Sequence, residues 1–207
     1  MSPKHPQKGR FVVFEGIDGS GTTTQCRMLS QRLRNAGRTV WTTSEPTGGP
    51  IGRVLRDILS GRLSAAPETV AYLFAADRSD HLLGTRGIIE RLDAGELVVC
   101  DRYKHSSLAY QSVENDPRLV ADLNRRFVDP DILFFVDVPA SVGEQRISSR
   151  ARREIYERIA FQEQVRSRYL ELLADESRFR VEILDGSGTQ AAIAEKIWLV
   201  LHEASII

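Results

Sequence analysis

The sequence has little cysteine and lacks long apolar segments. Only two cysteines occur in its 207 residues, Cys26 and Cys100, and neither lies in a CxxC or other metal-ligand pattern. The sequence therefore predicts no disulfide framework and no cysteine-bound zinc, and a reducing cytoplasm is the expected location. No apolar run approaches the ~18 residues of a membrane span. Residues 1–10 carry positive charges with no apolar run behind them, so a secretory signal is not predicted.

The sequence also lacks an excess of charge of either sign. Lysine and arginine together number 28, as do aspartate and glutamate, so the formal net charge is zero. A nucleic-acid-binding scaffold would carry a basic excess, and no nucleic acid partner is predicted. The content of hydrophobic residues (42%) and charged residues (27%) is that of an ordinary globular protein. A chain of this length fits one domain with a single core.

Short apolar segments alternate along the chain with longer segments of helical period. Strands that are almost wholly apolar and separated by helices predict a parallel sheet covered on both faces. We expect one α/β domain with about five strands over residues 10–207, preceded by a disordered polar tail at residues 1–9. The predicted strands are 11–15, 39–43, 97–101, 132–138 and 181–184. The predicted helices are 22–36, 51–59, 67–93 (kinked near Gly84 and Gly87), 117–128, 139–149, 155–173 and 190–202.

A glycine-rich loop joins the first strand to the first helix. Its sequence, GIDGSGTT, matches the phosphate-binding pattern G-x-x-x-x-G-K-[ST] at every constrained position but one. Glycines let backbone N–H groups face phosphate oxygens at a helix N-terminus, and the last threonine can place its hydroxyl on Mg²⁺. The pattern predicts a P-loop NTPase-type fold. The expected ATP-binding residues are Gly16, Ile17, Asp18, Gly19, Ser20, Gly21, Thr22 and Thr23.

Thr22 stands where this pattern has a lysine. That lysine normally bridges the β- and γ-phosphates and follows the transferred charge, whereas threonine brings no charge. Either other cations compensate, with Lys104 and the arginines of residues 150–158 as the available sources, or the protein binds nucleotide without catalysing transfer.

Four further segments resemble the thymidylate kinase (dTMP kinase) family. In chain order they read SEPTGGPIGRVLRDIL, LFAADR, VVCDRYKHSSLAYQ and REIYERIAFQEQVRSRYLEL. The second and third are highly specific, and the resemblance runs from about Phe11 to the C-terminal helix. It implies transfer of the γ-phosphoryl group of ATP to dTMP with Mg²⁺, in dTTP biosynthesis. It also implies a homodimer and a short arginine-rich lid over residues 148–158.

The resemblance implies roles for individual residues as well. Asp101 would lie near Mg²⁺ with Thr23, Arg102 would bind the dTMP phosphate, and Arg150 and Arg153 are the leading catalytic arginines of the lid. The implied dTMP-binding residues are Asp18, Phe74, Arg78, Arg102, Ser107, Tyr110, Gln111, Tyr156 and Glu157.

Within that set the implied contacts differ. Phe74 would stack on thymine, and Arg78, one helical turn later, would contact the base. Asp18 would bind the sugar 3′-hydroxyl. Either Ser107 or Gln111 can hydrogen-bond thymine N3, because both side chains donate and accept. Tyr156 and Glu157 would lie near the deoxyribose, while Tyr110 would form part of the wall around the base.

These assignments have alternatives. Phe74 can be a core residue, Asp101 and Arg102 a solvated pair, and the arginine cluster a solvated surface. Asp137 also resembles a metal-binding aspartate after an apolar strand, but we interpret it as structural. The alternative functions are kinase activity on another deoxynucleotide and nucleotide binding with lost or weak kinase activity. A GTPase is not predicted, since no NKxD motif occurs.

Overall fold

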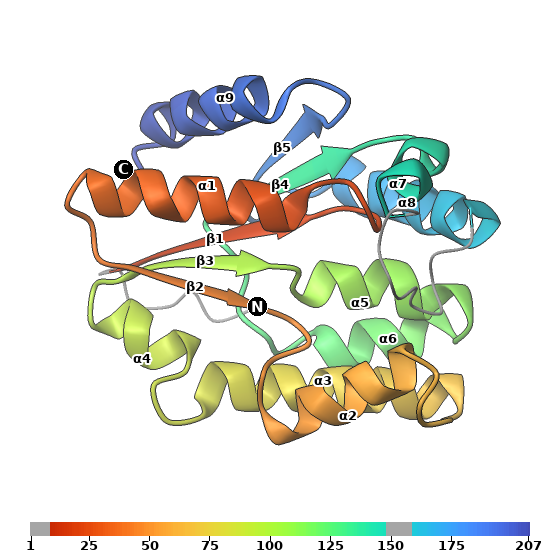
Figure 1. The fold of residues 1–207 in the computed structure, drawn as a ribbon. Helices are drawn as coiled ribbons and strands as arrows, with labels where there is room; N and C mark the ends of the chain where they lie inside the picture. The colour runs from red at the N-terminus through yellow and green to blue at the C-terminus, as the bar shows by residue number, and fades with distance from the viewer. Residues whose placement is uncertain (1–8, 148–158) are drawn as a thin grey trace.

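Five parallel strands form the centre of the molecule, in the order β2-β3-β1-β4-β5 (Figure 1). The computed structural model describes residues 9–147 and 159–207. The three inner strands are almost wholly buried, as their apolar sequences predict. The strands are β1 (Arg10–Glu15), β2 (Val40–Ser44), β3 (Leu97–Asp101), β4 (Ile132–Asp137) and β5 (Arg180–Asp185). All five predicted strands are confirmed to within one residue at each end.

Helices cover both faces of this sheet (Figure 1). On one face α1 and α9 pack on side chains such as Phe14 and Phe134, and on the other α4, α5 and α8 pack around Phe11 and Phe135. Helix α2 packs against α3 in a smaller cluster of its own. The helices are α1 (Thr22–Asn35), α2 (Pro50–Leu59), α3 (Pro67–Leu83), α4 (Ile88–Asp93), α5 (Lys104–Tyr110), the 3₁₀ turn η1 (Gln111–Val113), α6 (Pro117–Asn124), α7 (Ala140–Ile147), α8 (Ile159–Ala174) and α9 (Gln190–Glu203).

The prediction of one kinked helix over residues 67–93 is wrong. The chain forms two helices, α3 and α4, because residues 84–87 turn between them. Gly84 is extended and Arg86 has a φ of 58°, so neither continues the helical backbone. A Cβ atom on Gly87 would lie 2.8 Å from three carbonyl oxygens of the preceding turn, and only glycine fits this close approach.

Two other differences concern helices. Helix α5 and the 3₁₀ turn after it follow β3 directly, in a segment for which no helix was predicted. Helix α6 ends at Asn124, four residues earlier than predicted. Residues 148–158, which contain the predicted lid, and residues 1–8 lie outside the described part of the chain. Among the helices of residues 9–147 and 159–207, none is both long and apolar enough to span a membrane.

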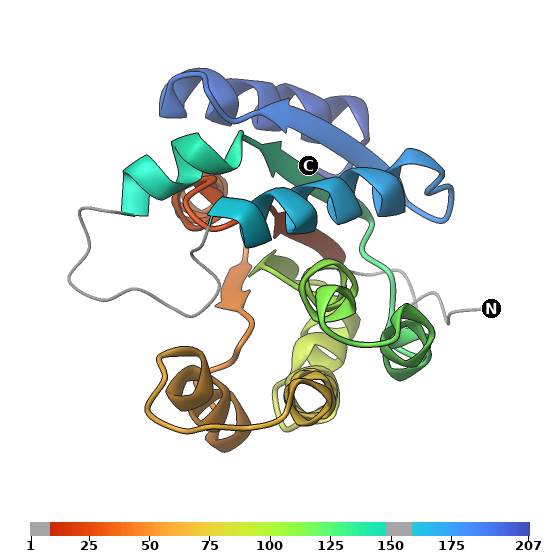
Figure 2. The ribbon, with the colours of Figure 1, turned by 90° about the vertical axis from the view of Figure 1, so that its right-hand side faces the viewer.

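The topology brings the carboxyl ends of the five strands to one edge of the sheet. Figure 2 looks at this edge, with α2 and α3 on one side of it and α7 on the other. In open parallel α/β sheets this edge is where ligands bind, because loops from neighbouring strands and helix N-termini meet there.

Candidate active site

A cavity of about 550 Å³ opens at the carboxyl edge of the sheet. The loop after β1 and the first turn of α1 form one wall, and α3 and α5 contribute another. Arg146 of α7 and Gly186–Ile193 close the end beyond the loop. This volume lies in the range of small-molecule sites and suits a nucleotide-sized ligand.

The glycine-rich loop leaves the N-terminus of α1 open to this cavity. Gly21 is the residue before the helix and has a φ of 105°, a conformation that favours glycine. Within the described residues no side chain caps this helix end, so backbone N–H groups of the first turn remain for a ligand. The arrangement fits the predicted binding of phosphate oxygens.

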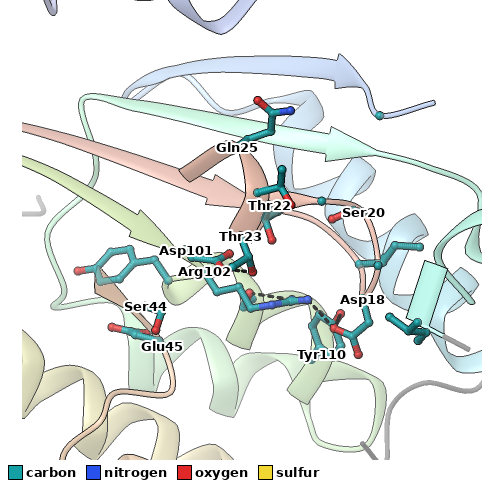
Figure 3. Close-up of a pocket in the computed structure, with 18 of the residues that line it drawn as sticks. Asp18, Ser20, Thr22, Thr23, Gln25, Ser44, Glu45, Asp101, Arg102 and Tyr110 are labelled. Atoms are coloured by element: carbon teal, nitrogen blue, oxygen red, sulfur yellow. Dashed lines mark hydrogen bonds and ion pairs between the residues drawn. The ribbon is translucent and has the colours of Figure 1, made fainter. Parts of the chain in front are cut away.

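Thr23 and Asp101 meet on the floor of the cavity (Figure 3). The Thr23 hydroxyl donates to Asp101 Oδ2 at 2.5 Å. Asp101 Oδ1 is buried and has no hydrogen-bond partner among the described residues. A carboxylate and a hydroxyl oxygen are ligands that Mg²⁺ accepts, so the pair fits the predicted metal site. Asp137 instead forms a two-point ion pair with Arg166, at 2.6 and 2.9 Å, which agrees with its interpretation as structural.

Arg102 places a positive charge beside the loop. It follows β3 in a left-handed conformation, with a φ of 68°, which turns its side chain into the cavity. Its Nη2 donates to Asp18 Oδ1 at 2.5 Å, and the guanidinium lies 5.1 Å from the centre of the Tyr110 ring. Figure 3 shows Asp18, Arg102 and Tyr110 grouped on the same side of the loop.

Asp18 is held by further contacts on both of its carboxylate oxygens. The Tyr110 hydroxyl donates to Oδ1 at 3.0 Å, and Gln162 Nε2 donates to Oδ2 at 3.0 Å. Gln162 Oε1 accepts the Asp18 N–H at 3.2 Å, so one amide binds both ends of this residue. Sequence reasoning missed Gln162, although it lies in the fourth segment that resembles the family.

Phe74 and Arg78 share one face of α3 and both line the cavity. Phe74 is 9% exposed and also packs on Leu55 and Leu59 of α2. Its ring therefore contacts the core and also lines the cavity. The Arg78 side chain is fully buried and binds Glu45 Oε2 through Nε at 2.8 Å and Nη2 at 2.7 Å.

The guanidinium nitrogens of Arg78 have further protein partners. Nη2 donates to the Tyr103 carbonyl at 3.2 Å and to the Ser107 hydroxyl at 3.0 Å, and Nη1 donates to Asn124. The contact of Arg78 with the base therefore stays a prediction. Gln111 lines the cavity, and its buried Oε1 has no hydrogen-bond partner in the described structure. Of the two candidates for thymine N3, Gln111 offers an acceptor without a partner in the described part of the chain, whereas the Ser107 hydroxyl already accepts from Arg78.

Comparison with known proteins decides the family. The family model for thymidylate kinase matches residues 14–197. The chain belongs to the thymidylate kinase family. It is thus a nucleoside monophosphate kinase, a phosphotransferase.

Curated relatives agree over most of the chain. A protein from Treponema pallidum named putative thymidylate kinase is 44% identical over 160 residues, which cover 77% of this chain and 76% of the relative. A putative thymidylate kinase from Aeropyrum pernix is 40% identical, covering 91% and 90%. A thymidylate kinase from Thermomicrobium roseum is 35% identical, covering 93% and 94%. The resemblance and the predicted P-loop NTPase-type fold are confirmed.

Lys104 does not take the place of the missing loop lysine. Its Nζ donates to the carbonyl of Phe127 at 2.8 Å and to Asp129 at 2.6 Å, in a buried position. That part of the prediction is wrong, because the Lys104 ammonium is bound to the loop between α6 and β4. Arg150, Arg153, Tyr156 and Glu157 lie outside the described residues.

Arg146 is a cation at the loop that sequence reasoning missed. Its Nη1 donates to the carbonyl oxygens of Gly19 at 3.3 Å and Ser20 at 3.2 Å, and its Nη2 donates to Gly186 at 2.9 Å. These contacts join α7 to the phosphate-binding loop and to the loop after β5. No short motif marks this arginine, because its partners are distant in the sequence.

Glu15 is a second ionisable residue that sequence reasoning treated only as the end of a strand. Its pKa is raised from 4.5 to about 7, because the effect of burial exceeds the lowering effects of the hydrogen bonds from Ser106 and Tyr169 and of the charge of Arg102. One pKa unit corresponds to about 1.4 kcal/mol, so ionised Glu15 lowers the free energy of unfolding by roughly 3 kcal/mol. Because the folded pKa is the higher one, stability at this site is greatest below pH 4.5 and declines as the pH rises through about 7.

Proposed function

We propose that this protein transfers the γ-phosphoryl group of ATP to dTMP, with Mg²⁺, to form dTDP and ADP. The proposal rests on one cavity in which the phosphate-binding loop, Asp18 included, faces Arg102 and Phe74. The loop side suits the polyphosphate of ATP. The opposite side offers a guanidinium to the phosphate, and an aromatic ring to the base, of a nucleoside monophosphate.

In this proposal the chain acts chiefly by positioning. The loop N–H groups hold ATP, Arg102 binds the acceptor phosphate, Asp18 accepts a hydrogen bond from the sugar 3′-hydroxyl, and Phe74 stacks on thymine. Thr23 and Asp101 would hold Mg²⁺, which neutralises charge on the phosphate oxygens when bound. The remaining roles proposed are those of Arg150 and Arg153 as catalytic lid arginines, Tyr156 and Glu157 near the deoxyribose, and Arg78, Tyr110, Gln111 and Ser107 around the base. A homodimer and a cytoplasmic location belong to the same proposal.

Release of ADP in the presence of dTMP, dUMP, dCMP or dGMP tests this function. We expect turnover to be greatest with dTMP. Greater turnover with another nucleotide would identify a kinase of that deoxynucleotide. Absence of turnover with all four, together with retained ATP binding, would identify a nucleotide-binding protein without kinase activity.

Replacing Phe74 by alanine is expected to raise the KM for dTMP and leave the KM for ATP nearly unchanged. A base-stacking contact is worth about 1–3 kcal/mol, so the change is about 5-fold to 150-fold. Tyr72→Ala on the same helix is the control, because Tyr72 is 47% exposed and should leave both constants unchanged. Steady-state kinetics with each substrate varied in turn measures this. Equal losses for both substrates would make Phe74 a core residue only.

Restoring the loop lysine is expected to have a small effect. Thr22 is buried at the start of α1 and lines the cavity. A positioned charge donor is typically worth ~10²–10³ in rate, but a site organised around its absence should gain less from its return. We expect Thr22→Lys to change kcat by at most about tenfold in either direction. An inactive wild type that gains activity only in this variant would contradict the proposed function.

A further inference from the structure

Glu15 ends β1 directly before the phosphate-binding loop, and the proposed function assigns it no role. Its side chain is completely buried. Oε1 accepts the backbone N–H groups of Tyr103 at 2.9 Å and Ser106 at 3.1 Å. Oε2 accepts the hydroxyl groups of Ser106 at 2.6 Å and Tyr169 at 2.8 Å. Four donors thus converge on one carboxylate.

Three of these donors belong to the segment that carries Arg102. Tyr103 follows Arg102 directly, and Ser106 lies in the first turn of α5. The left-handed backbone of Arg102 is uncommon for a residue with a side chain, so the surrounding contacts must hold this turn. The Ser106 hydroxyl also accepts a hydrogen bond from Arg102 Nη1 at 3.4 Å. Glu15 therefore contacts both the backbone after Arg102 and a partner of its guanidinium.

We propose that Glu15 is a positioning residue for Arg102. By holding the turn from Tyr103 to Ser106, it sets the guanidinium at the place where the phosphate of dTMP binds, and it touches no substrate itself. This inference rests on the proposed function and deepens it.

The chemistry of the site favours this role over simple packing. Burial disfavours the ionised carboxylate and raises the pKa of Glu15 to about 7. A glutamine has nearly the same volume and carries no charge, so packing alone gives no reason for a carboxylate here. The ionised carboxylate accepts all four hydrogen bonds without presenting a donor, whereas the protonated acid would present an O–H group.

The test compares Glu15→Gln with the wild type in binding dTMP and thymidine. The amide keeps one oxygen for the two backbone donors but presents an N–H group to the hydroxyls of Ser106 and Tyr169. Hydrogen bonds to charged groups are worth about 1.5–3 kcal/mol, so we expect dTMP affinity to fall about 10-fold to 150-fold. Thymidine lacks the phosphate that Arg102 binds, and its affinity should stay within about twofold, as should the KM for ATP.

Two further variants separate positioning from general damage. Tyr169→Phe removes one donor to Oε2, and we expect the same selective loss for dTMP, reduced to a few-fold. Asp131→Asn is the matched control. Its carboxylate accepts the N–H of Phe11 at 2.7 Å near the opposite end of β1, so it should lower the melting temperature without altering the ratio of dTMP to thymidine affinity.

The outcomes are distinguishable from failure of the proposed function. Equal losses for dTMP and thymidine, or no loss for either in a folded Glu15→Gln protein, would overturn the positioning role. If Glu15→Gln does not fold, the ratio of dTMP affinity to thymidine affinity in Tyr169→Phe tests the positioning role instead. Absence of dTMP-dependent ADP release by the wild type would overturn the proposed function itself.

Discussion

Replacing Arg102 by alanine is expected to lower kcat/KM for dTMP by about 10²–10³, the usual loss for a positioned donor to a charged group. The guanidinium lies between β3 and the loop, and Asp18 and the Tyr110 ring already hold it in the cavity, where it can meet the acceptor phosphate. Both kcat and the KM for dTMP should change, because the contact exists in the bound state and persists during transfer.

Arg32→Ala is the matched control for this variant. Arg32 of α1 forms an exposed ion pair with Glu195 of α9, at 2.7 Å, and its loss should leave the kinetics unchanged. Arg102→Lys should recover only part of the activity, since an ammonium group cannot reproduce a two-point contact with phosphate. Wild-type kinetics in Arg102→Ala would remove Arg102 from the acceptor site.

Replacing Asp101 by asparagine is expected to lower kcat by about 10²–10³ and to raise the Mg²⁺ concentration needed for half-maximal activity. The metal supplies several kcal/mol of charge stabilisation in phosphoryl transfer, and asparagine removes the charge that would hold it. The asparagine oxygen can still accept the Thr23 hydroxyl, so the fold of this region should persist. Activity measured across a Mg²⁺ titration shows both effects.

Asp137→Asn provides the control, because Asp137 also follows a strand but is paired with Arg166. We expect it to leave the Mg²⁺ dependence unchanged. If Asp137→Asn shifts the Mg²⁺ requirement and Asp101→Asn does not, the assignment of the two aspartates is reversed.

Local patterns account for the features that could be predicted. The five strands follow from apolar segments, since a strand buried on both faces needs apolar residues at consecutive positions. The loop follows from the spacing of Gly16, Gly21 and Thr23, because a strand-to-helix turn that binds phosphate through its backbone N–H groups needs glycine at fixed positions. The division of residues 67–93 into two helices escaped prediction, since the close packing of Gly87 depends on how the turn folds back.

Contacts between distant residues account for what escaped prediction at the site. Lys104 was a plausible cation for the loop by proximity to Asp101, yet its ammonium binds Asp129, 25 residues later. Gln162 holds Asp18 across 144 residues. A spacing pattern covers one segment and carries no information on which side chains from other segments will face it.

The parallel α/β fold, the phosphate-binding loop and the thymidylate kinase family were predictable, because each is marked by short segments of neighbouring residues. Three features became visible only in the folded protein: Asp101 has an oxygen with no partner among residues 9–147 and 159–207, Asp137 is paired with Arg166, and Glu15 lies among four donors. Hydrogen bonding and burial at the carboxyl edge of the sheet depend on the meeting of β1, β3, α5 and α8. These elements come together only when the chain has folded.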